Sequence, residues 1–320
     1  MNEKSFQLRN SVQSVSASCY RVTFTAAQRL DLPEYLGSTL RGAFGHAFRA
    51  LACPSRMDEP CPIPSECPYH LIFESSPPPD SDALRTHEEI PRPFVIAPEW
   101  RLAPERRDAR LVYECGQELS FGLVLIGRAQ EFFPHFVVAL REMDRIGRGR
   151  RAVELSRIEA IDPRSNSASV VYDARDNVVN GAGLPLTLED CARQPCPRGP
   201  VTIEFVTQTR LKHEGSWARI PEFHIVFRRL LGRLSSLARF HCGVPLDVDF
   251  KAMIDQAHEI RLTRNDTRWV SWSRYSSRQD KKMRWDGLLG AATYEGNLAS
   301  FWPYLKFGEY VHVGRGVTFG

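Results

Sequence analysis

Hydrophobic and polar positions alternate over residues 18–25, which predicts a half-buried β-strand. The apolar positions that follow recur every 3.6 residues and share one face: Leu36, Leu40, Phe44, Ala47, Phe48 and Leu51. We therefore predict a helix that opens at Pro33 and continues to about Ala52. Its opposite face carries His46 and Arg49.

The next patterns add a hairpin and a second helix. Residues 111–114 and 118–126 are two strand-like runs that we expect to pair across a turn at Gly116. Residues 130–146 follow a helical period, with Pro134 in the first turn. The first half of the chain therefore reads as strand, helix, hairpin and helix.

The same order recurs after a Pro- and Gly-rich stretch. We predict a strand from Val201, a helix over 223–237, paired strands at 270–275 and 288–294, a short helix, and a strand at 309–313. Two such series predict an α+β fold of two tandem ferredoxin-like (βαββαβ, RRM-like) domains. We expect domain 1–195 to carry a Cys/Pro-rich insertion at 53–100, and domain 196–320 to carry a basic segment and a glycine-rich tail.

Composition is that of a globular protein, with 42% hydrophobic and 25% charged residues. No apolar run approaches the roughly 20 residues of a membrane span, and the polar N-terminus does not resemble a signal peptide. We expect a cytoplasmic protein with no membrane partner, whose eight cysteines stay reduced.

The positive charge is concentrated between Arg261 and Arg284, where eight basic residues stand against two acidic ones. Three aromatic residues, Trp269, Trp272 and Tyr275, lie among them. Single-stranded RNA is commonly held by aromatic stacking and phosphate pairing, which makes this segment a candidate RNA-binding surface. The basic candidates are Arg268, Arg274, Arg278, Lys281, Lys282 and Arg284. The two tryptophans could equally belong to a core.

Four stretches of the chain resemble the RAMP-type endoribonucleases that process CRISPR repeats and mature crRNA. They are 40–47 (LRGAFGHA), 67–74 (CPYHLIFE) with 91–94 (PRPF), 274–279 (RYSSRQ) leading into 287–290 (GLLG), and 312–320 (HVGRGVTFG). The resemblance implies two ferredoxin-like domains and CRISPR repeat RNA as the partner. It also implies metal-independent cleavage by the ribose 2′-hydroxyl, which leaves a 2′,3′-cyclic phosphate and a 5′-hydroxyl.

The first of these stretches holds the candidate catalytic residues. His46 and Arg49 are three apart and so are neighbours on a helix; His can move a proton near neutral pH, and Arg can stabilise an anionic transition state. Arg41, in the same stretch, is a candidate RNA contact. The alternative is a solvent-facing His and Arg without a catalytic role.

The resemblance adds Tyr35 as a third catalytic candidate. On a continuous helix Tyr35 would lie about 16 Å from His46. Either Gly37 breaks the helix start and lets Tyr35 fold back, or Tyr35 is structural.

The glycine-rich tail offers backbone N–H groups for phosphates, with charge from Arg315. Its RNA-binding candidates are His312, Gly314, Arg315 and Gly316, and His312 is a second candidate for the chemistry. A tight turn explains the glycines equally well. Because the family usually continues beyond Gly320, we expect a shortened chain or one module of a longer fusion.

Cys53, Cys61, Cys67 and His70 provide four soft ligands, enough for a structural zinc site. No cofactor is expected for catalysis. The alternative is a proline-ordered loop with free thiols.

Two other functions stay open at this point. A RAMP subunit of an interference complex would hold crRNA beside other Cas proteins without cutting it, and burial of His46 in a core would favour that role. A metal-dependent nuclease is disfavoured, because the sequence has no paired-carboxylate motif.

Overall fold

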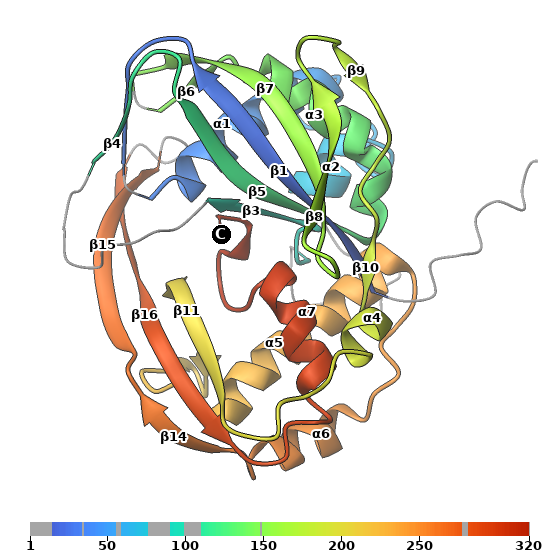
Figure 1. Ribbon diagram of the computed structural model, residues 1–320, viewed down its shortest axis with the longest axis vertical. Coiled ribbons are helices and arrows are strands. Elements are labelled where there is room, and N and C mark those ends of the chain that lie inside the picture. The colour runs from blue at the N-terminus through green and yellow to red at the C-terminus, as the bar shows by residue number, and fades with distance from the viewer. Residues whose placement is uncertain are drawn as a thin grey trace, which may run out of the picture.

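The first half of the chain forms a twisted antiparallel sheet with helices packed on it (Figure 1). In this computed structural model the described residues are 15–33, 35–55, 59–75, 90–98, 110–147, 149–276 and 281–319. The elements of the first half are β1 (Ser16–Ala26), β2 (Leu30–Pro33), α1 (Gly37–Ala52), α2 (Pro68–Phe73), β3 (Phe94–Pro98), β4 (Arg110–Tyr113), β5 (Glu118–Ile126), η2 (Gly127–Phe132), α3 (Phe133–Glu142), β6 (Arg145–Ile146), β7 (Arg151–Asp162), β8 (Ser167–Asp173), β9 (Val178–Val179), β10 (Leu186–Thr187) and α4 (Leu188–Ala192).

Strand order identifies the topology of this half. The sheet runs β3-β5-β1-β7 before it continues into β8 and β9. Along the chain the same strands alternate with α1 and α3 as β1-α1-β3-β5-α3-β7. This is the split βαβ arrangement of a ferredoxin-like domain, as the sequence predicted.

The second half repeats the plan around one long strand. Its elements are β11 (Val201–Thr209), β12 (Lys212–His213), β13 (Ser216–Trp217), α5 (Phe223–Leu237), the π-helical turn η3 (Ala238–Cys242), α6 (Phe250–Ala257), β14 (Arg261–Asn265), β15 (Arg268–Ser276), β16 (Lys281–Glu295), α7 (Trp302–Val311) and η4 (Val317–Phe319). β16 pairs with β11 along one edge and with β14 and β15 along the other. The β15–β16 ribbon curves along one side of the molecule in Figure 1.

The central strand β1 of the first sheet packs against other elements on both faces. Tyr20, Val22 and Phe24 of β1 pack with α1 and α3. On the other face, Cys19 joins a cluster that includes Leu234 of α5, Phe307 of α7 and other residues of both halves. The strand predicted at 18–25 as half-buried is therefore a central strand buried on both faces except at exposed Arg21, because the second half of the chain packs on its outer face.

Several predicted elements differ from the structure. The helix predicted from Pro33 begins at Gly37, because Pro33 ends β2, which pairs with β4. β4 and β5 are both strands, but β5 pairs with β1 and β3, so the predicted hairpin is wrong.

The predicted pairing of 270–275 with 288–294 is also wrong: residues 270–275 pair with 282–287 of the long strand β16, whose later part pairs with β11 and β14. Two further differences concern helix ends. The helix predicted over 130–146 is a 3₁₀ turn followed by α3, which ends at Glu142 because β6 pairs with β7. The strand predicted at 309–313 is wrong, since α7 continues to Val311 and buries Phe307 and Val311 four residues apart on one face. The domain boundary near residue 195 lies between α4 and β11 and stays a prediction.

No helix within the described ranges has both the length and the apolar character that crossing a bilayer requires.

Candidate functional site

Helix α1 presents His46 to solvent. Leu40, Phe44 and Phe48 are buried in the first core, as their spacing predicted. His46 is exposed and Arg49 is partly buried. Leu51 is 43% exposed, so its predicted place in the core stripe is wrong. The face that carries His46 is therefore open to a ligand.

Helix α2 flanks α1 through aromatic rings and arginines. A Cβ at Gly45 would lie 3.3 Å from the Phe73 ring, so the glycine lets the two helices approach closely. The guanidinium of Arg41 lies over Phe73, 5.7 Å from the ring centroid, and that of Arg49 lies over Tyr69 at 5.4 Å. Both contacts hold arginine side chains of α1, the helix that carries His46, against α2.

Gly42 has a different environment from Gly45. A Cβ at Gly42 would meet no atom within 4 Å, and the residue is exposed. One glycine of the motif is thus explained by packing inside this chain, whereas the other leaves a bare stretch of α1 that a large ligand can approach.

Tyr35 is not positioned like a catalytic residue. It precedes α1 and is only 8% exposed. Nine residues of helix separate Gly37 from His46, a rise of about 14 Å. The helix start does break before Gly37, yet the ring is buried rather than displayed beside exposed His46. This burial supports the structural alternative for Tyr35, and its catalytic role stays a prediction.

The glycine-rich tail returns to α1 from the far end of the chain. Its last turn, η4, packs against α1 and β3, and Figure 1 shows this red segment between the two halves. Gly314 and Gly316 have φ of +101° and +83°, the left-handed region that favours glycine. The N–H of Arg315 donates to the carbonyl of Arg210, 3.2 Å away.

These contacts separate the tail residues that the protein's own turn uses from the one that is open to RNA. Gly314 and Gly316 are required by the turn, and the Arg315 amide is occupied by a protein acceptor. The exposed Arg315 side chain extends from a turn fixed beside α1. Its guanidinium is thus a better candidate for a phosphate contact than its backbone amide.

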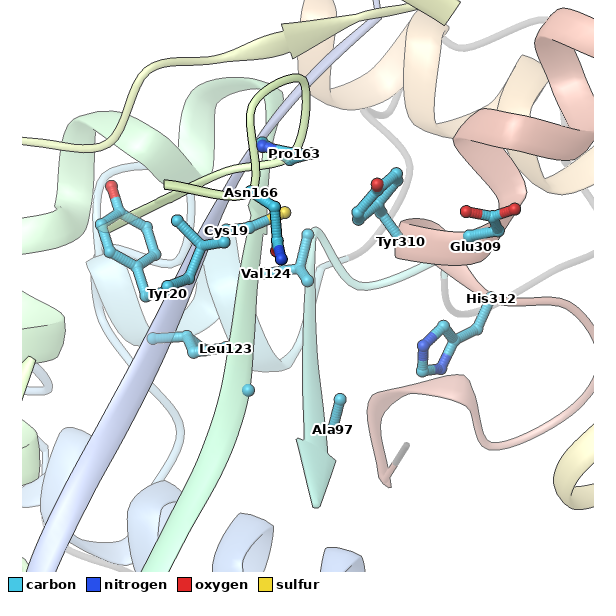
Figure 2. Close-up of a pocket in the computed structure, with 12 residues that line it drawn as sticks. Cys19, Tyr20, Ala97, Leu123, Val124, Pro163, Asn166, Glu309, Tyr310 and His312 are labelled. Carbon is cyan, nitrogen blue, oxygen red and sulfur yellow. The ribbon is translucent and has the colours of Figure 1, made fainter. Parts of the chain in front are cut away.

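His312 lines a pocket between the first sheet and the end of α7. Figure 2 shows its ring near Ala97 of β3, on the same side as Glu309 and Tyr310. Burial, with a smaller effect from Arg233, lowers the pKa of His312 to about 4. The imidazole is therefore neutral near pH 7 and offers hydrogen bonds rather than charge to RNA.

The basic segment lies on the β15–β16 ribbon. Arg268 is exposed on β15, opposite Leu289. The backbone of β15 pairs Arg274 with Met283 and Tyr275 with Lys282, and the same ladder includes Lys281 and Arg284. Arg278 lies outside the described residues. The ladder thus brings basic residues from both strands onto one ribbon.

Two arginines that the sequence reasoning did not single out organise this ribbon. Arg219 stacks over Trp269 at 3.8 Å, and Trp269 is partly buried against the second core. Arg210 forms an ion pair with Asp286 and lies over the ring of Trp217. Their partners lie up to 76 residues away along the chain, so no local spacing could reveal them.

The three cysteines of the insertion lie together. The sulfur atoms of Cys53, Cys61 and Cys67 are all within 4.8 Å of one another. His70 is not part of this group, and its Nε2 instead lies 3.6 Å from a carboxylate oxygen of Glu74. The structure thus brings together three of the four ligands considered for zinc.

Sequence comparisons identify two regions of the chain. Residues 203–320 match the family model described as CRISPR-associated endoribonuclease Cas6. Residues 15–183 match the model AF_1859_N, described as an N-terminal domain. No curated protein sequence matches the chain.

Solved structures show the same fold over nearly the whole length. A Cas6 (TTHB231) product complex has a TM-score of 0.57 at 16% identity, covering 95% of this chain and 97% of that one. Thermus thermophilus Cas6 (TTHB231) gives 0.52 at 14% identity, with 96% of both chains covered. A Cas6 (TTHA0078) product complex gives 0.51 at 15% identity, with 95% and 96% covered.

These matches agree with the tandem ferredoxin-like fold. The chain is therefore similar to the CRISPR-associated Cas6 endoribonucleases: residues 203–320 match their family model, and the fold matches that of Cas6 structures over nearly the whole length.

Proposed function

We propose that this protein binds CRISPR repeat RNA and cuts it to produce crRNA, with His46 moving the proton of the attacking 2′-hydroxyl. The observation that carries the proposal is the exposure of His46 on α1, the helix whose Arg41 and Arg49 lie over aromatic rings of α2 and against which the last turn of the glycine-rich tail packs. Two of the similar structures are Cas6 product complexes, which supports RNA as the substrate class.

The proposed chemistry is an internal transesterification. His46 accepts the 2′-hydroxyl proton, the oxygen attacks the adjacent phosphorus, and the bond to the 5′-oxygen breaks. Arg49 stabilises the extra negative charge on the phosphate, since an arginine stays protonated and cannot act as the base. The products are a 2′,3′-cyclic phosphate and a 5′-hydroxyl.

The RNA path runs from the ribbon to α1. The basic residues of the β15–β16 ribbon bind phosphates, and Arg41 and Arg315 contact RNA near His46. A binding-only role is the weaker alternative, because a subunit that merely holds crRNA has no need of an exposed His at this position.

Metal ions are not part of the proposed reaction. Within the described ranges, the one group of at least three candidate metal ligands is the three cysteines, and thiolates are poor ligands for the magnesium that two-metal nucleases use, which supports this proposal. The proton transfer and the charge stabilisation are both assigned to side chains.

A repeat RNA with one 2′-deoxy nucleotide before the scissile phosphate tests this mechanism. In magnesium-free buffer, the protein should cut the all-ribose RNA and bind the deoxy RNA with similar affinity without cutting it. Cleavage of the deoxy RNA would contradict internal attack, and a strict need for added magnesium would contradict metal-independent chemistry.

A further inference from the structure

The three cysteines of the insertion lie between the end of α1 and the start of α2. Cys53 is the C-cap of α1, and Cys67 is the N-cap of α2. Cys61 lies on the loop between them. The three residues come from separate positions of a proline-rich stretch, and the fold nevertheless brings their sulfur atoms within 4.8 Å of one another.

This spacing suits a tetrahedral metal ion. Zinc binds thiolate sulfur at about 2.3 Å, which places the sulfurs of a tetrahedral site about 3.8 Å apart. Small side-chain movements would bring the three sulfur atoms to the distances at which they bind one ion. All three cysteines are free thiols, and Cys67 is fully buried whereas the other two are half-buried.

The loop that carries Cys61 has little hydrophobic anchoring. Ile63 is 44% exposed, and the surrounding residues are mostly exposed. The loop is held by a few hydrogen bonds, such as that from the Cys67 N–H to the Ile63 carbonyl at 2.8 Å. In segments that bury little apolar surface, a bound metal commonly replaces the missing core.

We propose that Cys53, Cys61 and Cys67 bind one zinc ion that fastens the end of α1 to the start of α2. Among the described residues the protein ligands are these three thiolates, since His70 pairs with Glu74, and the fourth position is left to solvent. Zinc is favoured over magnesium or calcium, since thiolates are soft ligands.

The zinc ion would influence the candidate catalytic site around His46 by fixing the two helices that carry its residues. Cys53 follows directly after the helix that carries His46 and Arg49, and Cys67 begins the helix that carries Tyr69 and its contact with Arg49. The zinc is therefore a structural element that fixes α1 and α2 relative to each other, and it takes no part in the reaction.

Metal content of the purified full chain tests the site. Protein produced with zinc in the medium and without chelators should contain about one equivalent by elemental analysis. Cys61→Ser is the main variant, because Cys61 lies on the surface loop and its replacement leaves the buried core intact. It should lose at least about nine-tenths of the zinc, while its far-UV circular dichroism stays unchanged.

Two matched controls complete the experiment. Cys115→Ser removes an exposed thiol elsewhere, and His70→Ala removes the imidazole three residues after Cys67; both should keep one equivalent of zinc. Replacing zinc with cobalt should give the absorption of a tetrahedral thiolate site in the wild type and not in Cys61→Ser. Metal-free wild type, or full zinc in Cys61→Ser, would overturn the site, and zinc loss in His70→Ala would overturn the three-thiolate ligand set.

Discussion

The guanidinium of Arg49 lies over the ring of Tyr69, with its Cζ atom 5.4 Å from the ring centroid. Tyr69 in turn stacks on Phe73, whose ring packs against Gly45 of the same helix α1. Arg49 is thus held by a neighbouring helix rather than extending freely into solvent. A preorganised cation stabilises a developing negative charge better than one that must first be ordered.

The first prediction concerns this contact. Tyr69→Leu removes the aromatic face and should lower the cleavage rate of bound repeat RNA about 2- to 5-fold, the equivalent of about 0.5–1 kcal/mol for an exposed cation–π contact. Tyr69→Phe keeps the ring and should restore the rate. Single-turnover kinetics at saturating protein separates this effect from RNA affinity, which should not change. Equal loss in both variants would show that the hydroxyl, rather than the ring, matters.

A second prediction follows from a buried imidazole between the two halves. The Nε2–H of His241 donates to the Pro91 carbonyl at 2.7 Å, and His241 is 6% exposed. Burial lowers its pKa to about 4, although the hydrogen bond to Pro91 acts in the opposite direction. The native state therefore resists protonation at a pH where the unfolded chain, with a pKa near 6.5, accepts a proton.

Stability should consequently fall as the pH drops from about 6.5 to about 4, by up to about 3 kcal/mol from this group. Above pH 6.5 both states are neutral at this position and the contribution is constant. His241→Gln can still donate a hydrogen bond but does not titrate. The free energy of unfolding, measured with urea between about pH 4 and 6.5, should therefore depend on pH less steeply in this variant, by the equivalent of about one proton. An unchanged slope would mean that His241 is already protonated in the native state.

The third prediction concerns the basic ribbon. Arg274→Ala and Arg278→Ala should each weaken repeat RNA binding and reduce the slope of log K against log salt concentration by about one phosphate contact. Arg175→Ala is the control, because Arg175 is exposed on the far edge of the first sheet and pairs with Asp173. Binding isotherms at several salt concentrations check this. Unchanged slopes in both ribbon variants would place the RNA elsewhere.

Local periodicity was sufficient for the elements that depend on neighbouring residues. The 3.6-residue period placed Phe44 and Phe48 in the core and left His46 outside, and it placed α5 at its observed bounds. It failed at Pro33 and at residues 309–313, where the outcome depends on distant partners: β4 pairs with β2, and α7 packs between the two halves.

At the candidate site, too, the sequence did not reveal contacts between residues that are far apart along the chain. The motif around His46 could be found in the sequence, yet nothing local indicated that the tail turn near Val317 would pack on α1. Tyr35 was grouped with His46 because of the family resemblance, and the structure buries Tyr35 ahead of the helix. The Arg219–Trp269 stack was missed because it joins a loop to a strand 50 residues later.

The central claim is tested most directly by the cleavage rate of His46→Ala. Because His46 is exposed, its replacement should leave the fold and RNA affinity intact. Loss of a general base typically costs 10²–10⁴-fold, so the single-turnover rate with saturating protein should fall by roughly that factor. His135→Ala, on the solvent-exposed side of α3, is the matched control and should cut at the wild-type rate. A wild-type cleavage rate in His46→Ala would contradict the assignment of His46 and make His312 the next residue to replace.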